Sequence, residues 1–175
     1  TYQQIINMTL PKNNTSISKT RLYYVLWQIL SDLSFEDKKI VLEKLRLWAG
    51  QFSEARSDYL AMSVEELRLL VSDKLFEIGA HSVNHPMLSH LSRKKQEEEI
   101  IGSRQTLEDI LNKPVTSFAY PHGDYSTTTI EILKEQKLKY ACTVTPQKIT
   151  KSCDPFQLPR FGVLDWDGDE FEKKL

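Results

Sequence analysis

Two histidines stand four residues apart in residues 77–86, which read EIGAHSVNHP. The imidazole nitrogens of His81 and His85 are good ligands for zinc, cobalt or nickel, and one tight turn of backbone can bring both rings to a single ion. Ser82 lies between them and can hydrogen-bond the loop backbone. The spacing alone is equally consistent with two unrelated histidines, because a zinc site needs further ligands. The pair predicts metal binding if its surroundings support it.

The elements that must position this pair are short strands. After residue 75, apolar runs alternate with helical segments, which is typical of β/α units with a largely parallel sheet. We expect strands at 75–80, 115–119 and 140–144. Ligand sites in such sheets collect at the carboxyl ends of the strands. His81 and residues 120–124 (YPHGD) occupy such ends, so the sequence predicts that they lie together.

Helices are expected between these strands. One begins after Ser92 and ends before Pro114, with Ile100, Leu107 and Leu111 on its apolar face and residues 96–99 facing solvent. Others are expected at 127–137 and 168–175.

Before residue 75 the periodic segments are helical. Residues 21–33 and 36–49 each place apolar side chains on one face, and Ser34 can cap the second helix. Residues 63–66 (SVEE) form a capping box that opens a third helix through Val71. The sequence therefore predicts two regions, a mainly helical one at 1–74 and a β/α one at 75–175.

Composition limits the classes of function. The net charge of −1, from 23 basic and 24 acidic residues, gives no basic footprint for nucleic acid. No run approaches the roughly 18 to 20 apolar residues of a membrane span, and residues 1–20 lack the features of a secretory signal. The compartment stays open between a bacterial cell envelope and the cytoplasm. Cys142 and Cys153 are expected to be free buried thiols rather than a disulfide.

The sequence around the histidines resembles that of the NodB-type polysaccharide deacetylases, carbohydrate esterase family 4. The resemblance covers roughly residues 60–175. It rests on residues 77–88 (EIGAHSVNHPML), 118–123 (FAYPHG), and the tail segments 154–160 (DPFQLPR) and 165–168 (DWDG). It implies an α/β fold: a partial, distorted (β/α) barrel that lacks its first strands and carries an N-terminal helical insertion.

The resemblance implies a metal-dependent hydrolase that removes acetyl groups from N-acetylated sugars. His81 and His85 would bind the metal, zinc or else cobalt or nickel, with Ser82 supporting their loop. The backbone N–H of His122 would face the oxyanion, and Arg160 would orient a carboxylate unless it is simply a surface arginine. The remaining expectations concern substrate contacts, which fall on Tyr120, Pro121, Gly123, Tyr125 and Trp166.

Departures from the family pattern matter as much as the matches. The family's adjacent aspartates, which supply the base and a metal ligand, have no counterpart, because the sequence contains no Asp-Asp pair. His122 replaces a tyrosine, and it either takes part in proton transfer or only fills the tyrosine's space. A catalytic Leu-x-x-His segment is missing near the end.

Two hypotheses follow. In the first, the chain is an incomplete catalytic domain of a glycan deacetylase that binds its metal weakly and is inactive alone. In the second, it is a non-catalytic carbohydrate-binding or scaffolding relative that has lost the aspartates. Missing first strands would leave an open sheet edge, which invites pairing with another chain and predicts a homo-oligomer.

Overall fold

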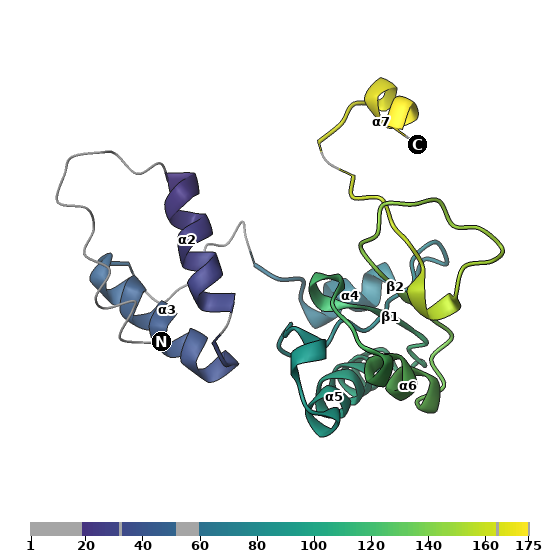
Figure 1. Cartoon of the computed structure of the whole chain (residues 1–175), viewed down its shortest axis with the longest axis horizontal. Coiled ribbons are helices and arrows are strands. Elements are labelled where there is room, and N and C mark those ends of the chain that lie inside the picture. The colour runs from purple at the N-terminus through teal and green to yellow at the C-terminus, as the bar shows by residue number, and fades with distance from the viewer. Residues whose placement is uncertain (1–18, 32, 52–59, 164, 175) are drawn as a thin grey trace. The chain divides into compact units, whose positions relative to one another are not determined.

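The structure is a computed structural model that describes residues 19–31, 33–51, 60–163 and 165–174. The chain divides into two compact units, Thr1–Leu60 and Ala61–Leu175 (Figure 1). The division falls earlier than the predicted change at 74/75. The helix around residues 64–70 belongs with the second unit.

The first unit contains helices α2 (Lys19–Ser31) and α3 (Phe35–Trp48). The N-terminus of α3 is capped as predicted, since the Ser34 hydroxyl accepts the N–H of Asp37. Val41 is buried, but Trp48 is 80 % exposed. The apolar faces of these helices are thus only partly covered within the described residues.

Helix α4 (Val64–Leu70) begins with the predicted capping box between Ser63 and Glu66. It packs against α5 (Arg93–Leu111). Arg68 Nε donates to the carbonyl of Ile110 at 3.0 Å. These contacts explain why α4 belongs to the second unit.

A parallel sheet lies at the centre of the second unit. Strands β1 (Ser117–Ala119) and β2 (Tyr140–Cys142) pair in parallel, and Phe118 faces Ala141 in the ladder. Single parallel bridges extend the sheet on both sides, from Ala80 to Phe118 and from Leu158 to Cys142.

The order across the sheet is therefore Ala80, β1, β2 and Leu158, which follows the order of the chain. The strand expected at 75–80 is reduced to the bridge at Ala80. Leu75 is 87 % exposed, so the start of the predicted strand is not part of the core.

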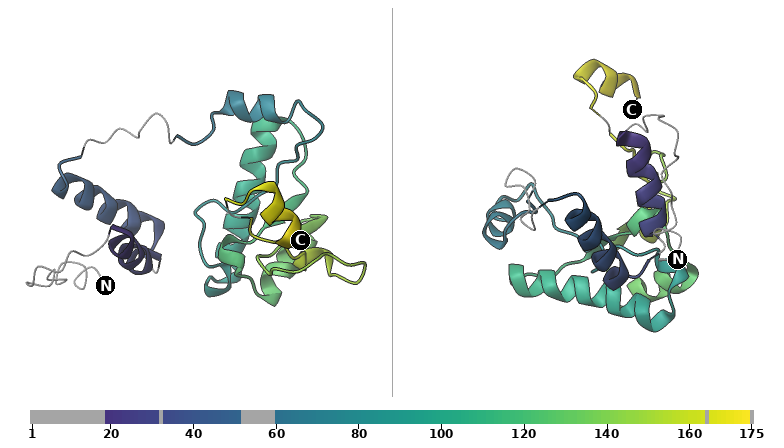
Figure 2. Two further views of the ribbon diagram at one scale, coloured as in Figure 1. Left: turned by 90° about the horizontal axis from the view of Figure 1, so that it is seen from above. Right: turned by 90° about the vertical axis from the view of Figure 1, so that its left-hand side faces the viewer.

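Helices α5 and α6 (Thr127–Glu135) lie side by side in the second unit (Figures 1 and 2). Ile100 from α5, Ile132 and Leu133 from α6, and Phe118 from β1 are fully buried together in one apolar cluster. Helix α5 ends at Leu111 and is followed by Asn112, which adopts left-handed backbone two residues before Pro114. The alternation of helices with strands confirms the predicted mixed α/β class.

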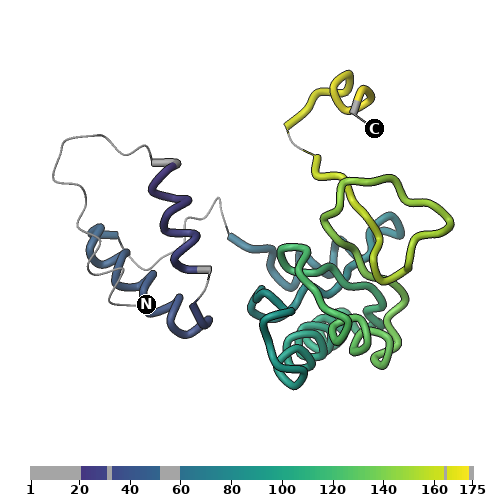
Figure 3. Tube along the Cα trace, viewed as in Figure 1, coloured from purple at the N-terminus to yellow at the C-terminus, as the bar shows by residue number. Residues whose placement is uncertain are grey.

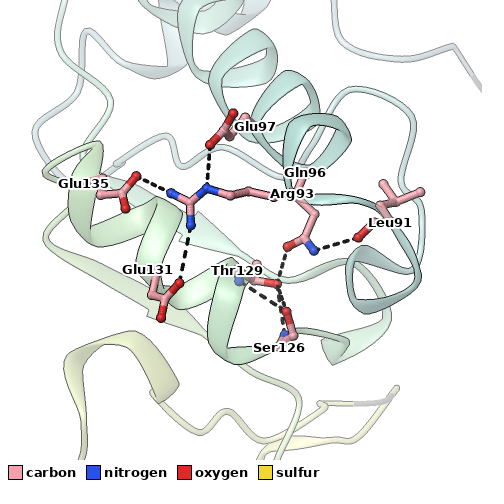
Figure 4. Close-up of polar contacts among 8 residues, drawn as sticks. All are labelled: Leu91, Arg93, Gln96, Glu97, Ser126, Thr129, Glu131 and Glu135. Carbon is pink, nitrogen blue, oxygen red and sulfur yellow. Dashed lines mark hydrogen bonds and ion pairs between the residues drawn. The ribbon is translucent and has the colours of Figure 1, made fainter.

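Polar contacts also join α5 to α6 (Figure 4). Arg93 contacts Glu97, Glu131 and Glu135 at the exposed rim. Beneath them, Gln96 is only 2 % exposed and accepts the hydroxyl of Thr129 at 2.6 Å. The prediction that residues 96–99 face solvent is wrong for Gln96, whose side chain also donates to the carbonyl of Leu91.

The remaining elements are short. Single-turn 3-10 helices lie in the connecting segments of the described residues, and the loop from β2 to the last of them can be traced in Figure 3. Their bounds, with that of the terminal helix, are η2 (Leu88–His90), η3 (Pro121–Gly123), η4 (Pro155–Gln157) and α7 (Gly168–Lys174). Cys142 and Cys153 are both free thiols of intermediate exposure. None of the helices in the described ranges has the length and apolar character that crossing a membrane requires.

Candidate functional site

His81 directly follows Ala80, the residue that bridges to β1. Its Nδ1 lies 2.7 Å from the carbonyl oxygen of Ala119, at the end of β1. A carbonyl only accepts hydrogen bonds, so Nδ1 must carry a proton, and in the neutral imidazole Nε2 then keeps its lone pair. Metal-binding histidines are commonly oriented in this way by a backbone carbonyl. The contact with Ala119 thus fixes the orientation of an exposed ring.

His85 ends a tight turn that Ser82 closes. The backbone N–H of His85 donates to the Ser82 hydroxyl at 3.0 Å. Both residues have left-handed backbone, with φ of 63° at Ser82 and 55° at His85. Such conformations are costly outside glycine, so other contacts must hold the turn. The Ser82 hydroxyl thus takes part in the hydrogen bonding of this turn.

Three imidazole rings meet at these strand ends. The ring centroids of His81 and His85 are 4.8 Å apart, and those of His85 and His122 are 4.3 Å apart, both in edge-to-face arrangement. The structure therefore brings residues 81–85 together with His122 of the segment 120–124, as their strand-end positions predicted.

The donor set fits part of a metal site. Protein zinc sites use three or four side-chain ligands. Within the described residues, no group of three or more His, Cys, Asp or Glu side chains is arranged to hold an ion. The part that fits is the pair His81 and His85, with the tautomer of His81 already set by Ala119.

Glu99 of α5 is a site residue that the sequence reasoning missed. It was expected to face solvent, but it is half-buried and its carboxylate accepts three hydrogen bonds from the histidine loop. The donors are the backbone amides of Val83 and Asn84, each at 2.8 Å, and the Asn84 side chain at 2.7 Å. A signal existed in the sequence, because Glu99 borders the helical stripe that contains Gln96, Ile100 and Ser103.

Asp124 lies in the predicted strand-end segment 120–124, but the sequence reasoning assigned it no role. Its carboxylate accepts both the backbone N–H and the hydroxyl of Ser89, each at 2.7 Å. Asp124 immediately follows η3, while Ser89 lies in η2. This pair ties the His122 segment to the chain that leaves the histidine loop.

Tyr120 is a core residue rather than a surface for sugar. Its side chain is 1 % exposed, and its hydroxyl donates to the carbonyl of Phe156 at 2.7 Å. Burial raises the pKa of the Tyr120 phenol well above the ordinary value of 10.0, and Tyr125 and Asp154 act in the same direction. The expected sugar contact of Tyr120 is therefore corrected: the buried ring positions η3 and cannot stack on a ligand.

The neighbouring predicted contact residues differ in exposure. Pro121 is also buried, so it supports the loop from the core side. Tyr125 is half-buried and stacks on Tyr120 with ring centroids 4.4 Å apart. Its hydroxyl donates to Gln157 Oε1 at 3.2 Å.

Gly123 has a structural reason to be glycine. Its φ is +71°, and a Cβ added there would lie 2.3 Å from Cγ2 of Val144. His122 beside it also has positive φ, at 56°. This turn brings the backbone of η3 close to the loop after β2.

Arg160 lies past the bridge at Leu158. Its Nε donates to the carbonyl of Thr143 at 2.9 Å, and its backbone N–H donates to the carbonyl of Thr145 at 3.0 Å. The arginine is thus anchored to the loop that follows β2. Trp166 is half-buried and lies in the segment that leads to α7.

The chain is similar in sequence to known proteins. The profile described as polysaccharide deacetylase matches residues 41–141, more than half of the chain. A peptidoglycan deacetylase of Helicobacter pylori is 27 % identical over 100 residues, which are 57 % of this chain and 33 % of that protein. The profile match begins inside α3, whereas the resemblance of the sequence motifs began near residue 60.

Solved structures show the same fold. The Streptococcus pyogenes deacetylase PplD, in complex with acetate, superposes with a TM-score of 0.62 at 22 % identity and covers 67 % of this chain and 52 % of its own. A polysaccharide deacetylase from Bacillus cereus gives a TM-score of 0.58 at 26 % identity and covers 65 % and 36 %. The chain spans between about a third and a half of the length of these proteins.

Proposed function

Because this chain belongs to the polysaccharide deacetylase family, we propose that its protein removes acetyl groups by hydrolysis from N-acetylated glycans. The observation that carries the proposal is the hydrogen bond from His81 Nδ1 to the carbonyl of Ala119, which leaves Nε2 ready to bind a metal. The substrate class comes from the family.

His81 and His85 would hold a divalent metal, zinc or else cobalt or nickel. A metal bound there would supply Lewis-acid polarisation of the amide carbonyl. Two imidazoles fall short of the usual three protein ligands, so this chain by itself should hold the ion weakly. The family's adjacent aspartates have no counterpart among the 175 residues.

The chain's own groups would act around the reacting amide. We assign the backbone N–H of His122 to the oxyanion, because η3 brings this residue beside His85. The His122 ring would then fill the place of the family's tyrosine or pass a proton. Arg160, anchored on Thr143, would orient a carboxylate. Tyr125 and Trp166, both partly exposed, would contact the sugar.

In this proposal the second unit is part of a distorted (β/α) barrel. The parallel succession of Ala80, β1, β2 and Leu158 in chain order supports this interpretation. The helical region before it would be an insertion. We further propose that a second copy of the chain pairs with the sheet beside Ala80, which light scattering at rising concentration would detect as a dimer.

A non-catalytic, glycan-binding role is the second candidate. It is favoured by one observation, the missing Asp-Asp pair. A protein of this kind would bind N-acetylated oligosaccharides without releasing acetate.

A deacetylation assay of the full-length protein on several N-acetylated glycans separates the two candidates. Acetate release that is lost on adding a chelator, and lost in His81→Ala but kept in His90→Ala, supports the deacetylase. His90 is a suitable control because it is an exposed histidine at the end of η2. Glycan binding with no acetate release under any metal condition would favour the second candidate.

A further inference from the structure

The backbone between the two proposed metal ligands rests on α5. The Glu99 carboxylate takes the amide hydrogens of Val83 and Asn84 on one oxygen and the Asn84 side-chain amide on the other. Two of the three residues between His81 and His85 are thus bonded to a single side chain. Hydrogen bonds of this type, in which the acceptor is ionised, are the stronger class.

Burial of apolar side chains cannot hold this loop. Val83 is 56 % exposed, and His81, Asn84 and His85 are exposed as well. The positive φ at Ser82 and His85 also disfavours the observed conformation of this loop. Polar contacts must therefore set the loop's conformation.

The polar contacts divide the loop into three parts. The start is fixed by His81 on Ala119, and the region beyond His85 is fixed by Ser89 on Asp124. Glu99 fixes the middle. Its neighbour one turn along α5, Gly102, lets Val83 approach, since a Cβ at Gly102 would lie 3.2 Å from Cγ2 of Val83.

We propose that Glu99 is a positioning residue for the metal site, which sets the separation and direction of the His81 and His85 rings through the backbone of Val83 and Asn84. This inference rests on the proposed function for the metal itself. The part that concerns the loop rests only on the contacts of Glu99. A residue that orients ligands in this way typically changes metal affinity by about 10- to 100-fold when it is altered.

Glu99→Gln tests the proposal with little change in shape. A carboxamide has one accepting oxygen, so either the two backbone amides or the Asn84 side chain loses its acceptor. Glu98→Gln is the matched control, because it makes the same change at the adjacent exposed position.

A double variant, Glu99→Gln with Asn84→Asp, offers a rescue. The oxygen of the new amide at position 99 can still accept both backbone amides, and its NH₂ group can donate to the new carboxylate at position 84. All three hydrogen bonds are then possible again. The single Asn84→Asp variant controls for the added carboxylate, which would face Glu99 as a like charge.

Two measurements decide the outcome on folded protein. We expect Glu99→Gln to speed amide hydrogen exchange at positions 83 and 84 and to weaken zinc or cobalt binding about 10-fold, while Glu98→Gln changes neither. The double variant should recover slow exchange. Exchange and affinity in Glu99→Gln that equal those of Glu98→Gln would overturn the proposal.

The exchange measurement also separates this proposal from the proposed function. If the parent chain binds no metal, the metal site is lost as an assignment, yet faster exchange in Glu99→Gln would still show that Glu99 holds the loop. If Glu99→Gln does not fold, Glu99→Asp serves as the second variant. It keeps the charge but shortens the reach, and unchanged exchange in that variant counts against Glu99.

Discussion

His81 and Ala119 lie 38 residues apart in the chain, and the imidazole Nδ1 of the first sits 2.7 Å from the carbonyl oxygen of the second. This hydrogen bond joins the residue that follows the bridged Ala80 to the last residue of β1. The hydrogen bond fixes the tautomer of a solvent-exposed ring. A surface histidine with no ligand to bind does not need a fixed tautomer. This relationship is the main reason to treat the segment as a ligand site.

His81→Ala should abolish the metal binding of the chain, because it removes one of two proposed ligands. His90→Ala should leave binding unchanged. Calorimetric titration with zinc and with cobalt measures both, and it should also show weaker binding as the solution is acidified, since protons compete with the metal for imidazole. Equal affinities in His81→Ala and the parent would remove His81 from the site.

Gly123→Ala should destabilise the second unit for two separable reasons. The positive φ costs a non-glycine residue about 1–2 kcal/mol, and the new Cβ collides with Val144. Overpacking of this kind adds about 1–3 kcal/mol. Urea unfolding should therefore show a loss larger than the φ term alone.

The combination Gly123→Ala with Val144→Ala should recover the steric part and leave the φ part. Gly162→Ala is the control, because it meets no atom within 4 Å and has ordinary backbone. If Val144→Ala gives no recovery, the contact with Val144 is not what requires glycine.

The buried polar pair between α5 and α6 should matter more than the exposed ion pairs. Gln96→Leu leaves the Thr129 hydroxyl without its acceptor and should cost about 1–3 kcal/mol. Arg93→Met removes ion pairs that are open to solvent and should cost less than Gln96→Leu. Chemical denaturation ranks the two, and the reverse order would contradict this account of the interface.

Alkaline solution should destabilise the fold through Tyr120. Burial raises the pKa of this phenol in the folded state, so its contribution is fully present below the unfolded pKa of about 10 and is lost as the pH rises toward the folded value. Tyr120→Phe should flatten the fall in the free energy of unfolding above about pH 10. The exposed Tyr24→Phe is the control and should keep the parental slope.

Much of the fold could be predicted because the signals are local. The caps at Ser34 and Ser63 involve residues three positions apart, and the alternation of apolar runs and helices gave β1, β2, α5 and α6 close to their observed bounds. The strand at 75–80 was overestimated, because an apolar run forms a strand only where a neighbour pairs with it.

The site was predictable at the strand ends and less so in its supports. His81, His85 and His122 meet because parallel strands end at one edge. The contacts of Glu99 and Asp124 could not be predicted because each carboxylate accepts from the backbone of a distant segment, at Val83 and at Ser89. Helical periodicity places Glu99 beside the buried stripe of α5, but it does not identify the residue that Glu99 contacts. Tyr120 was misjudged because an aromatic residue at a strand end can point into the core.

The left-handed turns at Ser82 and His85 have a consequence for engineering. A short peptide copied from residues 81–85 would relax to ordinary backbone, because the hydrogen bond from the His85 amide to the Ser82 hydroxyl is too weak to compensate two residues with positive φ. Transferring this histidine pair to another protein would require the first two turns of α5 to be transferred as well, so that a carboxylate lies opposite the turn. The portable unit is a loop with its helix, and the pentapeptide alone is too small to carry it.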